Sequence, residues 1–196
     1  MINIEWQEYN RVQLLQHLVT TRNYKHYLEI GCDKNQVFDL IKVELKEGVD
    51  PNRGGTQRMT SDAFFKKDNR TWDLIFIDGL HTYEQVARDF SNAFARLNSG
   101  GTIVIHDMLP TRASQATALP TEKYWVGDVW RLAFDLSNRD DLNFKLFKFD
   151  FGCGIVTHGT QASLNVVADD TWEFYKNNYA NLPLTTFEEY FNNASV

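Results

Sequence analysis

The sequence predicts an α/β fold: a Rossmann-like, seven-stranded, mainly parallel sheet with an antiparallel last strand and helices on both faces. Short apolar segments alternate with helical patterns along the chain, as expected for parallel strands joined by crossover helices. The last two apolar segments, within 143–159, are separated only by a short bend. Parallel neighbours need a long crossover, so this pair must be antiparallel.

The first elements follow from local patterns. Apolar residues at helical spacing predict an amphipathic helix over 5–19, and an apolar run ending at a glycine predicts a buried strand over 24–31. A short helical segment over 35–45 leads to a second strand that ends within 46–51. A third strand is expected over 56–65, running into a turn.

The middle of the chain carries the clearest signals. A continuous apolar run over 72–79 predicts a strand covered on both faces. A one-sided apolar pattern predicts a helix over 82–97, followed by a second buried strand over 102–107. Residues 108–123 contain two prolines and no periodicity, which predicts an irregular loop, and a helix resumes over 126–136. The tail is expected to be helical near 170–180 and 186–192.

Size and composition indicate one globular domain. The chain has 196 residues, of which 43% are hydrophobic and 14% aromatic, enough for a sizeable core. We expect a single domain over 1–196, with an N-terminal helix in 1–20, the core in 24–158 and a helical tail in 159–196.

Charge and patterning exclude several classes of function. The net charge of −6 argues against a nucleic-acid partner, which usually requires a basic face. No apolar stretch approaches the ~18 residues of a membrane span. The two cysteines, Cys32 and Cys153, lie far apart, so a reduced intracellular compartment is favoured. We expect a cytoplasmic protein with a small-molecule partner; a homo-oligomer is compatible with the sequence.

In open α/β sheets ligands bind beyond the carboxyl ends of the strands, so the residues that follow each strand are the candidates. Glu29 and Gly31 end the first strand and suit a cationic ligand group beside a tightly turning backbone. The later glycines of a nucleotide-binding turn are replaced by Asp33 and Asn35, which tolerate left-handed conformations. An ordinary strand-ending glycine is the alternative.

The second and third strands supply candidates for a nucleoside. Asp50 follows Glu29 by 21 positions, about the distance at which a carboxylate holds ribose hydroxyls. A turn or cap aspartate is the alternative. Ser61 and Asp62 are placed where an adenine edge could bind, although either could equally be a helix N-cap.

The most informative cluster follows the fourth and fifth strands. Asp78 and His81 come from one strand end, and His106 and Asp107 from the next. Burying carboxylates and imidazoles costs free energy unless they are hydrogen-bonded, paired with a charge or bound to a metal. A divalent metal would take Asp78, Asp107 and, as a third ligand, His106; Asp78 is also a cofactor-binding candidate. Alternatively, Asp78 caps the next helix and His106 bonds to backbone. Asp128, after the loop, is expected to stabilise a helix start.

Six segments of the chain resemble a known family: YLEIG, GVDP, WDLIFIDGLHTYEQVARDF, LNSGGTIVIHD, GDVW and FGCGIV. They are similar to the small class I methyltransferases grouped with macrocin O-methyltransferase and cephalosporin hydroxylase-like proteins, over roughly 24–158. The resemblance implies S-adenosylmethionine as cofactor. It also implies that Glu29 and Gly31 hold the methionine part and Asp50 the ribose, with Ser61-Asp62 near the adenine.

The same resemblance bears on catalysis. It implies that His81 is the base, and that in metal-using relatives Asp78 and the pair matching His106-Asp107 bind Mg²⁺. This chain departs at His106, where those relatives carry an acidic residue, and imidazole suits softer divalent cations.

We therefore expect an enzyme that methylates a small-molecule or sugar hydroxyl. The reaction could proceed with or without assistance from a divalent metal. A nicotinamide dehydrogenase is disfavoured because the G-x-G-x-x-G pattern is missing. The remaining alternative is a non-catalytic nucleotide- or S-adenosylmethionine-binding Rossmann-fold protein. The clustered Asp and His residues favour the enzyme.

Overall fold

The computed structural model describes residues 1–193. The strands, in chain order, are β1 (His26–Ile30), β2 (Leu45–Val49), β3 (Trp72–Ile77), β4 (Leu97–Ile105), β5 (Leu142–Phe147), β6 (Cys153–His158) and β7 (Leu184–Thr185). The helices are α1 (Arg11–Arg22), α2 (Ser61–Lys67), α3 (Tyr83–Phe94), α4 (Trp130–Asn138), α5 (Trp172–Asn178) and α6 (Phe187–Asn193), with short 3₁₀ turns at Ala113–Gln115 and Tyr179–Asn181.

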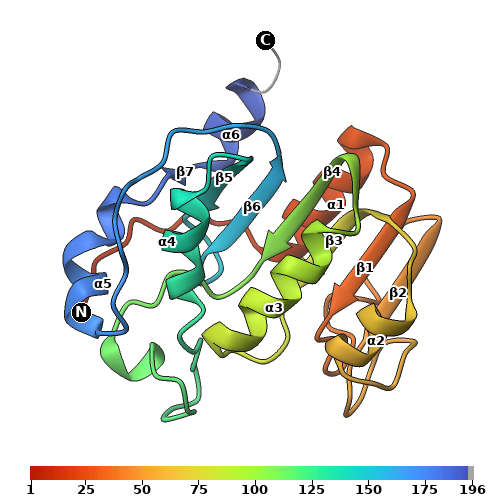
Figure 1. Cartoon of the computed structure of the whole chain (residues 1–196), viewed down its shortest axis with the longest axis horizontal. Coiled ribbons are helices and arrows are strands. Elements are labelled where there is room, and N and C mark those ends of the chain that lie inside the picture. The colour runs from red at the N-terminus through yellow and green to blue at the C-terminus, as the bar shows by residue number, and fades with distance from the viewer. Residues whose placement is uncertain (194–196) are drawn as a thin grey trace.

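The strands form one mixed sheet in the order β2-β1-β3-β4-β6-β5-β7. All described neighbours pair in parallel except β6, which runs antiparallel to both β4 and β5. The Rossmann-like, mainly parallel fold predicted from the sequence is therefore confirmed. Because β1 to β4 run in one direction, their carboxyl ends meet at the same edge of the sheet (Figure 1).

Two apolar cores cover the two faces of this sheet. On one face, α2, α3 and α4 pack on side chains such as Ile75 and Ile103. On the other face, α1 packs on side chains such as Leu74 and Val104. Figure 1 shows α3 and α4 in front of the sheet and α1 behind it. This alternation along each strand explains the continuous apolar runs in the sequence, because both faces are buried.

One predicted strand is wrong, and another element completes the sheet. Residues 56–65 hold only an isolated bridge at Gln57, and the chain then enters α2. The Thr60 side chain accepts a hydrogen bond from the Ala63 backbone, so an N-cap outweighs the strand pattern. The seventh strand is instead the short β7, which pairs with β5 in the tail. The antiparallel strand, β6, accordingly lies inside the sheet and not at its edge.

One expected helix is absent, and others differ in extent: those expected over 82–97 and 126–136 are α3 (Tyr83–Phe94) and α4 (Trp130–Asn138). Residues 35–40 form turns rather than a helix, Asn35 there has a positive φ of 62°, and Leu45 already begins β2. The first helix begins only at Arg11, because the side chains of Asn10 and Gln13 form a reciprocal capping box. Asn10 therefore fixes where α1 starts.

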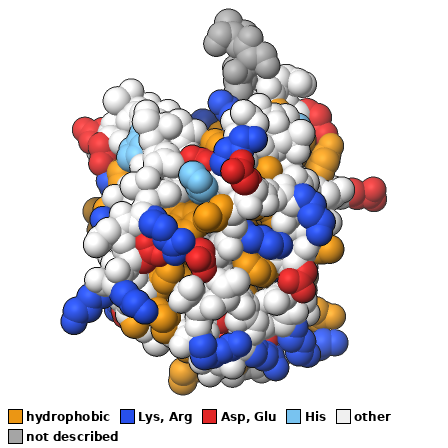
Figure 2. Space-filling model, turned by 90° about the vertical axis from the view of Figure 1, so that its right-hand side faces the viewer, with side chains coloured by type: hydrophobic (Ala, Val, Ile, Leu, Met, Phe, Trp, Pro, Cys, Tyr) orange, Lys and Arg blue, Asp and Glu red, His pale blue; other side chains and the backbone are white. Residues whose placement is uncertain are grey.

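Within 1–193, no helix is both long and apolar enough to cross a bilayer. The face in Figure 2 mixes acidic, basic and apolar side chains, with several basic ones along its lower edge. Such interspersed charge is the usual composition of a solvated surface. The compartment, the partners and the oligomeric state stay predictions.

Candidate functional site

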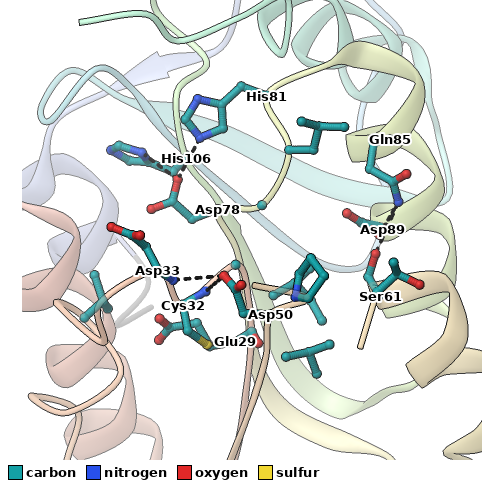
Figure 3. A pocket seen from close by; sticks show the side chains of 18 of the residues that line it. Glu29, Cys32, Asp33, Asp50, Ser61, Asp78, His81, Gln85, Asp89 and His106 are labelled. Carbon is teal, nitrogen blue, oxygen red and sulfur yellow. Dashed lines mark hydrogen bonds and ion pairs between the residues drawn. The ribbon is translucent and has the colours of Figure 1, made fainter. Parts of the chain in front are cut away.

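The carboxyl ends of β1 to β4 open into a cavity of about 590 Å³, within the usual range for small-molecule sites. Figure 3 looks into this cavity. Its lining includes every site residue predicted from the sequence: Glu29, Gly31, Asp50, Ser61, Asp62, Asp78, His81, His106 and Asp107. The topology thus brings the candidates for cofactor binding and for catalysis into one space.

The end of β1 is built around a buried carboxyl and a glycine. Glu29 is 1% exposed, and the Tyr27 hydroxyl donates a hydrogen bond to its Oε2 at 2.5 Å. Burial raises the pKa of Glu29 to about 8. Gly31 has a φ of +86°, and a Cβ there would lie 2.2 Å from the Asp78 carbonyl oxygen. Only glycine allows the β1 turn to approach the end of β3 this closely.

Asp50, at the end of β2, organises the backbone of two turns. Its Oδ2 accepts from the amides of Cys32 and Asp33 at 3.1 and 3.0 Å, and its Oδ1 from those of Asn52 and Arg53 at 2.8 and 2.9 Å. Burial opposes ionisation, but these bonds lower the pKa of Asp50. A carboxylate has about four lone-pair sites, so a ribose diol would have to replace one of these amides.

The far end of the cavity holds an amide and a carboxyl that the sequence reasoning missed. Gln85 Nε2 donates to Ser61 Oγ at 3.2 Å and to Asp89 Oδ1 at 3.0 Å (Figure 3). Asp89 is 1% exposed, and burial raises its pKa. Gln85 and Asp89 are four residues apart and share a face of α3. That spacing next to an apolar stripe is the signal that could have identified them.

Two carboxylates and two imidazoles form a closed ring where β3 and β4 end. Asp78 Oδ1 lies 3.5 Å from His81 Nε2 and 3.2 Å from His106 Nδ1. Asp107 lies 3.2 Å from His81 Nδ1 through Oδ2 and 3.2 Å from His106 Nδ1 through Oδ1. Asp107 has a φ of +64°, a left-handed conformation that non-glycine residues seldom adopt. The four side chains predicted to cluster therefore contact one another.

Burial and charge act in opposite directions on this ring. Burial disfavours both imidazolium ions, but the interaction with Asp78 and the charge of Asp107 raise the pKa of His81. The same carboxylates raise the pKa of His106 well above its ordinary value. Burial likewise opposes ionisation of Asp78, yet His106 and His81 hold its pKa well below its usual range.

Arg11 and Asp150 extend the ring and were missed by the sequence reasoning. Arg11 Nη1 lies 2.8 Å from both Asp150 oxygens and 3.3 Å from His106 Nε2, and Arg11 Nε lies 3.6 Å from Asp78 Oδ2. Asp150 sits in the bend between β5 and β6 with a φ of +48°. No local pattern marks a lone arginine in a helix as a site residue, because its role depends on how α1 packs.

The loop before α4 closes over His81. The Trp125 ring stacks on the His81 ring, with centroids 5.2 Å apart. At Gly127, whose φ is +72°, a Cβ would lie 1.7 Å from the His81 carbonyl oxygen. Asp128 Oδ1 accepts from the Tyr83 amide at 2.7 Å. Asp128 therefore does stabilise a helix start, but it is that of α3 and not of α4.

A divalent cation has a candidate donor set here, but the surroundings suit it poorly. Donor atoms of Asp78, His81 and Asp107 lie within 4.8 Å of one another. Mg²⁺ prefers oxygen ligands, whereas both carboxylates contact His106 and Arg11 adds a permanent positive charge beside Asp78. These residues do not fit Mg²⁺. The glycine turn at β1 and the polar cavity beyond it do fit a nucleoside with an amino-acid tail.

A Rossmann-like sheet with an antiparallel β6 between β4 and β5, and with a ligand cavity at its strand ends, defines the class I methyltransferase fold. The sequence confirms this class. A family model described as a methyltransferase domain matches residues 9–108, about half of the chain. The chain belongs to this methyltransferase family. A search of curated protein sequences found no significant match.

Solved structures support the same fold. A Klebsiella pneumoniae protein assigned as an O-methyltransferase is 13% identical, with a TM-score of 0.59 over 81% of this chain and 84% of that chain. The O-methyltransferase from Bacillus cereus, in complex with S-adenosylhomocysteine, is 14% identical, with a TM-score of 0.57 over 78% and 83%. MycE of mycinamycin biosynthesis, bound to Mg, S-adenosylhomocysteine and mycinamycin VI, is 15% identical, with a TM-score of 0.51 over 76% and 49%.

Proposed function

We propose that this protein transfers a methyl group from S-adenosylmethionine to a hydroxyl of a small molecule. One observation carries the proposal: a single cavity joins the Glu29–Gly31 turn to His81 and Asp107. A nucleoside site and a candidate proton acceptor thus share one space. Family membership and the O-methyltransferases among the structural neighbours support the same reaction.

The cofactor supplies an electrophilic methyl group when bound, so the residues of this chain have two tasks. Glu29 and the turn at Gly31 bind the methionine part, and Ser61 with Asp62 lies at the adenine end. Asp50 shapes the turns on either side of the ribose position, because its carboxylate accepts hydrogen bonds from four backbone amides. Holding both reactants in line can contribute several kcal/mol to lowering the barrier, on the order of a well-oriented intramolecular reaction.

The acceptor oxygen must lose its proton as it attacks. His81 lines the cavity, and its imidazole lies between the carboxylates of Asp78 and Asp107. We assign His81 as the general base, with the two carboxylates orienting the ring and stabilising its protonated form. A positioned base typically contributes about 10²–10⁴-fold. A hydroxyl has a high pKa and gains most from such a base, which favours oxygen as the acceptor atom.

Two measurements test this function. Calorimetry should detect S-adenosylhomocysteine binding to the folded protein, and NAD should not bind. Once an acceptor is found by screening, His81→Gln should lower kcat by about 10²-fold or more and leave S-adenosylhomocysteine affinity nearly unchanged. Binding without turnover on any hydroxyl acceptor would leave the non-catalytic alternative. No S-adenosylhomocysteine binding to well-folded protein would refute the proposal.

A further inference from the structure

Arg11 is anchored in the site by its backbone and its side chain together. It is the first residue of α1, and its backbone amide donates to Asp150 Oδ2 at 2.9 Å. Its guanidinium contacts both oxygens of the same carboxylate at 2.8 Å. Bidentate contacts between arginine and carboxylate are strong and geometrically specific. Asp150 therefore fixes where this positive charge lies.

The fixed charge lies beside the carboxylates that would bind a metal. Arg11 Nε is 3.6 Å from Asp78 Oδ2 and has no hydrogen-bond partner within residues 1–193. Arg11 also lines the cavity. Asp78 and Asp107 are 16% and 6% exposed at their side chains, and carboxylates this deeply placed need a positive partner. The guanidinium supplies one to Asp78 without any ion, because arginine stays protonated in proteins.

We propose that Arg11 is a resident cation that takes the place of a divalent metal at Asp78, so that the acceptor site works without one. This inference rests on the proposed function, since it concerns how the same acceptor site is charged. Arg11 acts as a positioning residue: it neutralises Asp78 and excludes a second cation by repulsion. Asp150 is its anchor.

Metal binding by the full-length protein tests this without an acceptor. Mn²⁺ titrations, followed by electron paramagnetic resonance, would compare wild type, Arg11→Gln, Arg11→Lys and Arg22→Gln. Arg22 is an exposed arginine at the other end of α1, so its variant is the matched control. Wild type and the control should bind Mn²⁺ no tighter than about 1 mM, the weak end of divalent-cation sites.

Arg11→Gln keeps a polar side chain but loses the charge, so it should bind Mn²⁺ at least tenfold more tightly, and a second change, Asp107→Asn, should abolish the gain. Arg11→Lys keeps the charge and should behave like wild type. Micromolar Mn²⁺ binding by wild type that Asp107→Asn removes would overturn the inference, even if Arg11→Gln fails to fold. A folded Arg11→Gln with wild-type Mn²⁺ affinity would also overturn it.

S-adenosylhomocysteine titrations on the same samples separate the two ideas. Failure of wild type to bind S-adenosylhomocysteine refutes the proposed function, whatever Mn²⁺ does. Normal S-adenosylhomocysteine binding together with tight Mn²⁺ binding at Asp107 refutes only the resident cation. Weak Mn²⁺ binding by wild type, with intact S-adenosylhomocysteine binding, supports both the proposed function and the resident cation.

Discussion

At the scale of single residues, the site contains two buried carboxyl groups whose hydrogen-bond donors differ. Glu29 has a neutral donor, the Tyr27 hydroxyl, and its pKa is raised by burial. Asp50 has four backbone amides, and its pKa is lowered despite burial. The two side chains lie at adjacent strand ends, yet they differ in charge near neutral pH. Hydrogen bonds to the charged form decide this difference.

Glu29 should make stability depend on pH. Its ordinary pKa of 4.5 rises to about 8 in the folded state, so between these values the folded protein holds a proton that the unfolded chain has released. The stabilisation is full below the lower value and is lost as pH rises through the upper one. Over this window wild type should lose on the order of a few kcal/mol of unfolding free energy, whereas Glu29→Gln should lose much less.

Urea unfolding of both proteins between pH 5 and pH 9, read by circular dichroism, checks this prediction. Asp73→Asn is a useful control, because the pKa of Asp73 is lowered by its hydrogen bonds despite burial. That variant should keep the alkaline loss seen in wild type. Parallel pH profiles for wild type and Glu29→Gln would contradict the prediction.

Glu29 should also couple proton release to cofactor binding. If the ammonium of S-adenosylhomocysteine binds beside this carboxyl, its charge favours the carboxylate. Binding near pH 7 should then release up to one proton per site, and the release should vanish in Glu29→Gln. Calorimetry in buffers of different ionisation enthalpy measures the proton count. An observed enthalpy that is independent of the buffer would argue against an ammonium beside Glu29.

At the scale of elements, the segment between β4 and α4 has two parts with different roles. Residues 106–110 are buried, and the amides of Met108 and Leu109 donate to the β5–β6 bend at 3.2 and 2.7 Å. The mostly exposed stretch 116–124 follows, and then Trp125 stacks on His81. The irregular loop predicted over 108–123 is therefore anchored at its first residues, and we expect only its later part to open, as a lid over the acceptor site.

Hydrogen exchange should resolve these two parts. Amides of His106, Met108 and Leu109 should exchange as slowly as those of β4, and amides of 116–119 and 121–124 should exchange quickly in the free protein. Cofactor plus acceptor should slow exchange in 116–124. Uniformly slow exchange across the whole segment in the free protein would exclude a lid.

Gly127 should be the least replaceable residue of this segment. An alanine Cβ would lie 1.7 Å from the His81 carbonyl oxygen, and the φ of +72° is already unfavourable for alanine. Gly100 is a matched control, with a φ of +77° and no atom within 4 Å of the position that a Cβ would take. Gly100→Ala should cost about 1–2 kcal/mol from backbone conformation alone. Gly127→Ala should cost more and should also lower turnover, because the loop cannot approach His81.

Thermal melts of the two glycine variants give the comparison, since 1 kcal/mol corresponds to roughly 2–4 °C in a domain of this size. Equal losses in melting temperature would mean that the contact with His81 contributes nothing. A Gly127→Ala protein with unchanged turnover would mean that the loop does not position His81.

At the scale of the whole molecule, Arg11 and Asp150 connect the first helix to the last bend of the sheet, 139 positions away. The two side chains are 26% and 15% exposed. Breaking one partner of a largely buried pair leaves the other charge uncompensated, which typically costs about 3–5 kcal/mol. The contact therefore ties the N-terminal segment to the site.

A double-mutant cycle with Arg11→Gln and Asp150→Asn should give a coupling free energy of about 1–3 kcal/mol. The exposed pair of Arg139 and Asp141, 36% and 56% exposed, is the control. Its coupling should be below about 1 kcal/mol because solvent screens it. Urea unfolding of the four proteins in each cycle supplies the numbers. Equal coupling in both cycles would mean that burial adds nothing to the Arg11–Asp150 contact.

The fold class and the candidate residues at the strand ends follow from the pattern of apolar and polar residues alone. Continuous apolar runs such as 72–79 require a sheet buried on both faces, and polar residues that follow such runs must meet at one edge. Asp78, His81, His106 and Asp107 were predictable for this reason. Local chemistry at Thr60, an N-cap, was enough to turn an expected strand into α2.

The charged partners of those residues, in contrast, depend on how distant segments pack. Arg11 reaches Asp78 because α1 packs on the rear face of the sheet, and Asp150 reaches Arg11 because the β5–β6 bend adopts a positive φ. Asp50 holds four amides from two turns. Contacts between segments far apart in the chain leave no periodicity or spacing in the sequence, since they arise from packing and not from local conformation.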